Sequence, residues 1–351
     1  MSLPIVIKNI LQDGIAIPAH PLALTAERNF DEAVQRRLTR YYLASGVGGI
    51  AIAVHSTQFE IRDPKINLLE KVLYTTADEI EKSGNANFVK VAGICGPVNQ
   101  AVEEARLAKS YGYHLGLLSM GGLKDLTEDA LIARAKAVAE VIPVFGFYLQ
   151  PAVGGRILSF DFWKKFADIP NVHAIKIAAF NRYQTLDVVR AVCSSERSGE
   201  IALYTGNDDN IIADLLTPYQ FEINGKLVKK EFRGGLLGHW AVWAHKAAAL
   251  LHKVKAYKAG NKQNAEEWLL KNVWVTDMNA AIFDPAHHFH GCIPGIHEVL
   301  RRQGLLEGTW CLNPEEVLSP GQADEITRVT QAYPELIDDD FVKTFLEKDR
   351  G

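Results

Sequence analysis

The chain has 351 residues, a formal net charge of −4 at pH 7 and 48% hydrophobic residues, a composition typical of a globular protein. A pI near 6.3 excludes the strongly basic surface with which proteins bind nucleic acid or anionic lipid. No segment reaches the roughly 18 uncharged apolar residues of a membrane helix, and the first residues, MSLPIVIKNILQDG, do not predict a signal peptide. We therefore expect a cytoplasmic protein whose four scattered cysteines are reduced thiols.

Short apolar runs alternate with longer amphipathic stretches from the N-terminus onward. The runs predict strands over 14–18, 49–54, 88–94, 114–118, 143–149, 172–177, 201–204 and 234–237. The stretches that follow them predict helices over 31–43, 66–82, 99–110, 127–141, 160–167, 185–193, 210–216 and 240–257. This alternation is typical of a parallel sheet. Eight units, with no Gly-x-Gly-x-x-Gly after the first strand, favour a (β/α)8 TIM barrel over an open doubly wound sheet.

Two regions fall outside the alternation. Residues 219–232 contain Asn224-Gly225 between two apolar runs, which predicts a hairpin with a type I′ turn; we expect this hairpin on the catalytic face. After it, residues 264–283, 295–303, 320–333 and 338–347 predict more helices. We therefore predict a barrel over 1–258 with a hairpin insertion, and a C-terminal helical extension over 259–351 that packs on the barrel.

A lysine and a tyrosine at neighbouring strand ends are the candidate catalytic residues. Lys176 lies near the end of strand 172–177, and a buried lysine is costly unless it has a partner or a function. A desolvated lysine with a lowered pKa is a Schiff-base nucleophile; the alternative is a lysine whose amine extends from the strand end to solvent. Tyr148 ends the preceding strand and is either a proton relay or an aromatic core residue.

These two residues carry a family resemblance. Tyr148 in a Y-x-x-P pattern, followed 28 positions later by Lys176, resembles the dihydrodipicolinate synthase and N-acetylneuraminate lyase superfamily. Further segments resemble the family in the same chain order: 46–59 (GVGGIAIAVHSTQF), 91–112 (VAGICGPVNQAVEEARLAKSYG), 206–209 (GNDD) and 234–239 (GGLLGH). The resemblance covers roughly residues 10–310.

The resemblance implies a barrel with a helical extension, usually assembled as a homotetramer. It also implies class I chemistry, in which Lys176 forms an imine with a 2-oxo acid, commonly pyruvate, and no cofactor is needed. Tyr148 would relay protons, and Ser56 and Thr57 would hold the substrate carboxylate, for which hydroxyl and backbone N–H groups are suited. The same resemblance places four further residues on the substrate side: His55, Gly206, Asp208 and His239.

The chain also departs from the family pattern. Gln58-Phe59 stand where Gly-Glu is usual, and His55 stands in place of a glycine. No tyrosine follows Leu118, and Val153 stands where the synthases have an arginine, so these departures argue against lysine biosynthesis. Asp208 and Asp209 stand where the lyases bind sugar hydroxyls, which indicates a polyhydroxylated substrate unless Asp208 caps the next helix.

We therefore expect a class I lyase or aldolase that acts on pyruvate or a sugar-derived 2-oxo acid, as a dimer or tetramer. Two alternatives stay open. One is a metal-assisted lyase that uses the cluster from His287 to Cys292 (HHFHGC), although a polar loop or subunit contact explains the cluster as well. The other is a non-catalytic barrel that binds a 2-oxo acid. At the lysine site itself we predict no metal.

Overall fold

The computed structural model describes residues 2–260 and 264–349. Its contacts divide the chain into two compact units, one made of residues 1–15 and 89–236 and the other of residues 16–88 and 237–351. The predicted extension, 259–351, therefore lies in one unit with 16–88 and 237–258. Among the described residues, none of the helices combines the length and the apolar composition that spanning a membrane requires.

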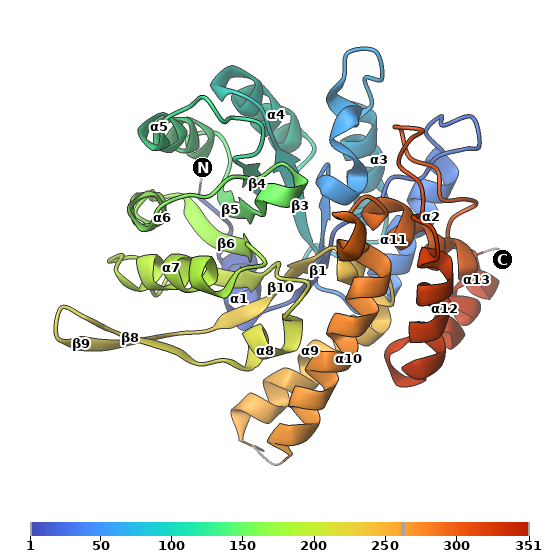
Figure 1. Ribbon diagram of the computed structural model, residues 1–351. Helices are drawn as coiled ribbons and strands as arrows, with labels where there is room; N and C mark the ends of the chain where they lie inside the picture. The colour runs from blue at the N-terminus through green and yellow to red at the C-terminus, as the bar shows by residue number, and fades with distance from the viewer. Residues whose placement is uncertain (1, 261–263, 350–351) are drawn as a thin grey trace. The chain divides into compact units, whose positions relative to one another are not determined.

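The first unit contains six parallel strands of the sheet. They are β3 (Val89–Ile94), β4 (Leu115–Ser119), β5 (Val144–Leu149), β6 (Val172–Ala178), β7 (Ala202–Thr205) and most of β10 (Phe232–Leu237). The helices are α1 (Ile5–Asp13), α4 (Val98–Ser110), α5 (Glu128–Ala139), α6 (Phe160–Ala167), α7 (Arg182–Cys193) and α8 (Ile211–Leu216). Helices α4 to α7 lie along the outer side of β3 to β6 (Figure 1). Strands β4, β5 and β6 are buried at every position, as strands covered on both faces must be.

The second unit combines the first strands of the barrel with the C-terminal helices. Its strands are β1 (Ala16–Pro18) and β2 (Gly49–Ile52), which are bridged in parallel by Ala19 and Ala51. Its helices are α2 (Glu32–Ala44), α3 (Leu69–Lys82), α9 (Ala244–Ala259), α10 (Ala265–Phe283), α11 (Cys292–Arg302), α12 (Gln322–Ala332) and α13 (Asp339–Asp349). Helices α10, α11 and α12 pack on one another, and α13 packs on α2.

The strand order confirms the predicted fold. The eight strands of the sheet follow the order β1-β10-β7-β6-β5-β4-β3-β2. Because β1 is also bridged to β2, the first and last strands of this order adjoin, which gives a nearly closed (β/α)8 barrel. Helix α1 was not predicted. The Leu11 carbonyl in this helix accepts a 3.0 Å hydrogen bond from the Tyr204 hydroxyl, so α1 lies against one end of the strands of the first unit.

Side-chain caps explain where several helices begin. Asp31, Thr127, Ser159 and Asn181 each accept a hydrogen bond from the backbone N–H three residues further on. Such bonds satisfy amides that the helix itself leaves unpaired. Local sequence therefore sets these starting points.

The predicted hairpin forms, but it lies at the amino end of the strands of its unit and not at the carboxyl end, where it was expected. Strands β8 (Tyr219–Ile223) and β9 (Lys226–Lys230) are antiparallel, and Asn224 and Gly225 have φ angles of 51° and 73°, as a type I′ turn requires. The buried Lys230 donates a 2.6 Å hydrogen bond to the Ile201 carbonyl, just before β7 begins. The hairpin is therefore anchored at the amino end of β7 and not on the catalytic face, because helix α8 first returns the chain to that end.

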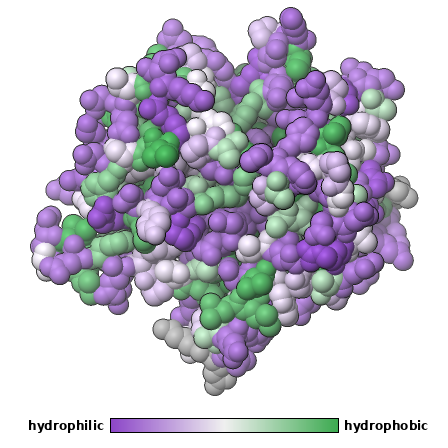
Figure 2. All heavy atoms as spheres, viewed as in Figure 1, coloured by the Kyte–Doolittle hydropathy of each residue, from purple (hydrophilic) through white to green (hydrophobic). Residues whose placement is uncertain are grey.

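The view in Figure 2 is mostly hydrophilic, with an apolar patch over α9 and the beginning of α10. Helix α10 contributes Leu269, Leu270 and Val273, whose side chains are 65%, 48% and 60% exposed. Assembly into a dimer or tetramer, as expected from the sequence, stays a prediction.

Candidate active site

Lys176 is a buried amine inside the first unit. It lies on β6 and is only 7% exposed. In the register of β5 with β6, Phe147 pairs with Lys176, so the two side chains share one face of the sheet. The Lys176 Nζ atom lies 4.4 Å from the centroid of the Phe147 ring. The ring face therefore stabilises a cation that has lost most of its hydration.

Burial lowers the pKa of Lys176 to about 8, and the negative charge of Asp208 opposes this shift. An unperturbed lysine titrates near 10.4, where very little free amine exists at neutral pH. A pKa of about 8 instead leaves roughly a tenth of the amine neutral at pH 7. The site therefore presents the nucleophilic form that imine chemistry needs.

Gly206 makes room for the lysine. A Cβ atom at this position would lie 2.5 Å from Lys176 Cε and 2.8 Å from the Ala178 Cβ atom, closer than such atoms approach. The Gly206 N–H donates a 2.7 Å hydrogen bond to the Ile177 carbonyl, which ties the end of β7 to β6. Glycine is thus required here by the close approach of the lysine side chain.

Asp208 follows two residues later and is 4% exposed. Its backbone N–H donates a 3.1 Å hydrogen bond to the Gly206 carbonyl, so a tight turn carries it. Its charge acts on Lys176, which identifies a carboxylate near the amine. The structure therefore brings together three of the predicted residues: Lys176, Gly206 and Asp208.

A buried polar network supports this turn. The side-chain amide of Asn207 donates to Asp214 Oδ2 at 2.8 Å, and the Thr205 hydroxyl donates to the same oxygen at 2.7 Å. Asn207 Oδ1 in turn accepts a 2.9 Å hydrogen bond from the Phe180 N–H, just after β6. The sequence alone does not single out Asn207 or Asp214. A GNDD segment by itself does not show which of its side chains points inward.

The role of Tyr148 as a proton relay stays a prediction. Tyr148 pairs with Ile177 in the register of β5 with β6 and therefore lies on the opposite face from Lys176. Its ring stacks on Trp163 of α6, with centroids 5.4 Å apart, and burial raises its pKa to about 12. The Y-x-x-P tyrosine is thus a core residue between strand and helix, and Phe147 occupies the position facing the amine.

Ser56 and Thr57 belong to the second unit. They lie in a short 3-10 turn, His55–Thr57, and both are buried. The Ser56 hydroxyl donates to the Ala19 carbonyl at 2.9 Å, and the Thr57 hydroxyl donates to the His20 carbonyl at 2.7 Å. Their protons are therefore used to hold the turn against the end of β1. His55 lies in the same turn, with its ring 6.0 Å from that of Phe59.

Two buried histidines of the second unit lie after strand ends. His239 follows β10 in the turn His239–Ala241, and its ring is 5.8 Å from that of Trp243. Burial lowers its pKa to about 4, so the imidazole is neutral at pH 7. His20, which the sequence alone does not single out, follows β1 and contacts Thr39 at 3.0 Å. Burial lowers its pKa to about 4 as well.

The cluster from His287 to Cys292 shows no converging set of metal ligands among the residues that the structure describes. His287 Nδ1 pairs with Asp284 Oδ1 at 2.5 Å. The other oxygen of Asp284 accepts hydrogen bonds from the Gly291 N–H and the Ser319 hydroxyl. Within 2–260 and 264–349, no three His, Cys, Asp or Glu side chains converge as metal ligands. The metal-assisted alternative thus has no ligand set in the described residues.

The fold and the lysine together define a class: a (β/α)8 barrel with a buried amine on its sixth strand. Comparison with solved structures sharpens this class to the fold of the dihydrodipicolinate synthases and N-acetylneuraminate lyases. The dihydrodipicolinate synthase of Oceanobacillus iheyensis is similar with a TM-score of 0.72 at 19% sequence identity, over 93% of this chain and 99% of that one. The resemblance predicted from the sequence is therefore confirmed for the fold.

Two further structures carry this fold with a bound small molecule. The N-acetylneuraminate lyase of Fusobacterium nucleatum, complexed with pyruvate, has a TM-score of 0.69 at 16% identity, covering 93% of this chain and 99% of that one. A prophage protein of the dihydrodipicolinic acid synthase family from E. coli, also in complex with pyruvate, has a TM-score of 0.72 at 18% identity, covering 91% and 98%. Neither a family model nor a curated protein matches the sequence.

Proposed function

We propose that this protein is a class I lyase or aldolase that forms an imine between Lys176 and a 2-oxo acid such as pyruvate. The observation that carries the proposal is the buried amine, whose pKa burial lowers to about 8. Two similar structures are described as pyruvate complexes, which supports a 2-oxo acid as the ligand class. No cofactor is needed, because the imine itself is the electron sink.

The chemistry follows from the neutral amine. Lys176 Nζ attacks the carbonyl carbon, and the resulting carbinolamine loses water to give the imine. The protonated imine then accepts the electron pair of a breaking C–C bond, or that of a C–H bond whose proton passes to a base, and so becomes an enamine. In a dehydration the enamine expels a hydroxyl group, which takes a proton and leaves as water. In a condensation the carbon of the enamine attacks the carbonyl of the second substrate. These steps need a group that moves protons. Since Tyr148 faces α6, we assign that role to Asp208, the carboxylate that acts on Lys176.

We assign the substrate carboxylate to the turn His55–Thr57. The hydroxyl protons of Ser56 and Thr57 are donated to backbone carbonyls, so these side chains orient the turn. The donor that we propose for the carboxylate is the backbone N–H of Ser56, in keeping with the use of backbone amides as anion sites. We assign His239, neutral at pH 7 because burial lowers its pKa to about 4, to a hydrogen bond with the substrate.

Borohydride trapping tests the proposal. Reduction in the presence of pyruvate is expected to attach one pyruvate-derived group to Lys176, located by peptide mass mapping, and Lys176→Ala is expected to abolish it. Lys230 is a matched internal control, because burial also lowers its pKa to about 8 but its amine is bonded to the Ile201 carbonyl. No adduct, or an adduct on Lys230 alone, would exclude the imine mechanism.

One observation favours a second candidate function, a barrel that binds a 2-oxo acid without turnover. Phe147 faces the amine where a tyrosine would relay protons. Under this alternative, trapping labels Lys176, but a panel of 2-oxo acids and aldehydes yields no product. Turnover with any member of the panel, lost in Lys176→Ala and slowed by Asp208→Asn, would decide for the enzyme.

A further inference from the structure

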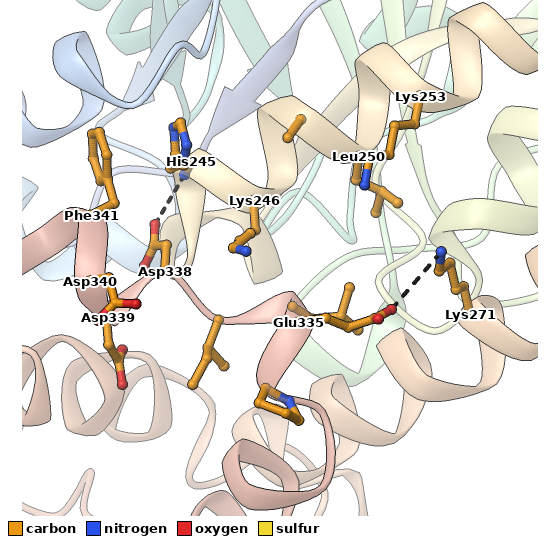
Figure 3. A pocket seen from close by; sticks show the side chains of 14 residues that line it. His245, Lys246, Leu250, Lys253, Lys271, Glu335, Asp338, Asp339, Asp340 and Phe341 are labelled. Carbon is orange, nitrogen blue, oxygen red and sulfur yellow. Dashed lines mark hydrogen bonds and ion pairs between the residues drawn. The ribbon is translucent and has the colours of Figure 1, made fainter.

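A cavity of about 750 Å³ lies within the second unit, and its lining includes none of the residues assigned to the proposed chemistry. It is bounded by α9, by the middle of α10 and by the segment 334–341 (Figure 3). Its volume is within the range of sites that hold small molecules. Every residue around it belongs to one compact unit, so the cavity is a feature of that unit alone.

One wall of the cavity is basic. Lys246 and Lys253 of α9 line it, together with Lys271 of α10. Lys271 is paired with Glu267 at 2.7 Å and with Glu335 at 3.9 Å. Lys246, by contrast, is half-buried, and neither it nor Lys253 forms an ion pair with any residue in the described ranges. In Figure 3, the Lys246 amine extends from α9 toward the segment across the cavity. This wall therefore carries two amines without an ion-pair partner among the described residues, of which Lys253 acts at longer range on Glu267.

The opposite wall is acidic, but its carboxylates are not equally available. Asp338 accepts hydrogen bonds from the Tyr41 hydroxyl at 2.8 Å, from the His245 N–H at 3.1 Å and from Gln303 at 2.8 Å, so its oxygens are occupied. Asp340 is exposed, lines the cavity and forms no ion pair with a residue that the structure describes. Asp340 lies in the first turn of α13, where the helix N-terminus favours a negative charge, so this side of the cavity presents an accessible carboxylate.

The remaining lining is largely apolar. Leu250 comes from α9, and Leu336 and Ile337 come from the facing segment. Phe341 closes one end, where its ring stacks on that of His245 with centroids 4.3 Å apart and planes at 4°. A ligand that fills the cavity therefore meets both charges and an apolar surface.

We propose that this cavity is a binding site for an α-amino acid with an apolar side chain. A purely anionic ligand would face Asp340, and a purely cationic one would face Lys246 and Lys253, so either would leave one wall repelling it. A zwitterion places its carboxylate at Lys246 and its ammonium at Asp340, and its side chain covers Leu250 and Ile337. Because this chemistry does not involve Lys176, the site stands independently of the proposed function.

The site is in contact with the surroundings of His239. Lys246, Leu250 and Leu336 also line a smaller cavity whose wall includes His239 and Trp243. A ligand that orders Lys246 therefore changes the packing next to these two rings. We expect binding to change the tryptophan fluorescence of the protein, and this change to be smaller in Trp243→Phe.

Calorimetric titration with three matched probes tests the site. L-norleucine has both charges, hexanoate lacks the ammonium group, and pentylamine lacks the carboxylate. We expect L-norleucine to bind saturably, and the other two to bind at least about tenfold more weakly, since each loses one charged contact. Absence of saturable L-norleucine binding, or equal binding of hexanoate, would overturn the proposal.

Variants on α9 locate the site. Lys246→Ala is expected to weaken L-norleucine binding at least about tenfold, whereas Lys255→Ala, on the same helix but outside the cavity lining, is expected to leave it unchanged. Lys176→Ala is expected to bind as the wild type does, which separates this test from that of the imine. Equal binding by the Lys246 and Lys255 variants would place the ligand elsewhere.

Discussion

The amine of Lys176 lies 4.4 Å from the centre of the Phe147 ring, and Phe147 is its partner in the register of β5 with β6. Tyr148, one residue further along, is consequently turned to the other face, where it stacks on Trp163. In this arrangement Phe147, and not Tyr148, shares a face of the sheet with the amine. The arrangement also makes the role of Tyr148 testable by a single substitution.

Tyr148→Phe removes a hydroxyl that the structure places between β5 and α6. We expect the rate of borohydride trapping with pyruvate to change by less than about twofold, since a general acid or base contributes 10²-fold or more only when it reaches the reacting atoms. Lys176→Ala provides the zero-rate reference. A hundredfold loss in a folded Tyr148→Phe protein would mean that the hydroxyl reaches the substrate.

Gly206→Ala tests the space that the amine occupies. The added methyl group would lie 2.5 Å from Lys176 Cε and must displace the side chain. We expect trapping with pyruvate to slow by at least about tenfold, because a misplaced nucleophile loses the geometry on which the reaction depends. Gly199→Ala is the matched control, as a Cβ atom there meets nothing within 4 Å. Equal rates in the two variants would contradict the contact.

Lys176→Met is expected to stabilise the protein at pH 7. Burial lowers the pKa of Lys176 from 10.5 to about 8, and this difference corresponds to about 3 kcal/mol of unfolding free energy, as an upper value. Below pH 8 the lysine is charged in both states, so the full cost of burying the charge is present. Between pH 8 and 10.5 only the unfolded state retains the proton, so wild-type stability rises with pH across this window.

Urea unfolding at pH 7 and pH 10.5 measures this difference. The unfolding midpoint of Lys176→Met is expected to exceed that of the wild type at pH 7, and the gap should close toward pH 10.5. Lys230, whose pKa is lowered in the same way, is present in both proteins, so its contribution to the pH dependence is the same in both and drops out of the difference. A gap that does not change with pH would show that the lysine is not buried as a charged group.

Shortening the hairpin tests whether it lies at the end of the barrel strands opposite to Lys176. Replacing residues 221–228 with Gly-Gly removes most of β8 and β9 but leaves Lys230, which anchors the chain at the amino end of β7. We expect trapping at Lys176 to change by less than about twofold, because the lysine lies toward the opposite end of the strands. Loss of trapping, with far-UV circular dichroism unchanged, would place the hairpin on the catalytic face after all.

Much of the fold could be read from local patterns. The alternation of short apolar runs with amphipathic stretches predicted all eight strands of the sheet, and Asn224-Gly225 predicted the turn of the hairpin. Helix α1 was missed because no strand precedes it to complete a βα unit. The predicted location of the hairpin was wrong. Its turn follows from local sequence, whereas its location depends on the direction in which the chain leaves α8.

The sequence by itself determined the barrel, the lysine on its sixth strand and the glycine and aspartate that follow the seventh. Only the tertiary structure decided which aromatic ring faces that lysine. In a strand buried on both faces the inward and outward residues are equally apolar, so composition does not distinguish them. The register shift between Val144 and Phe145 then pairs Phe147 with Lys176, so that the two side chains share a face. Side chains in a strand alternate between the two faces, so a shift of one residue in the register changes which residues of β5 share a face with the lysine.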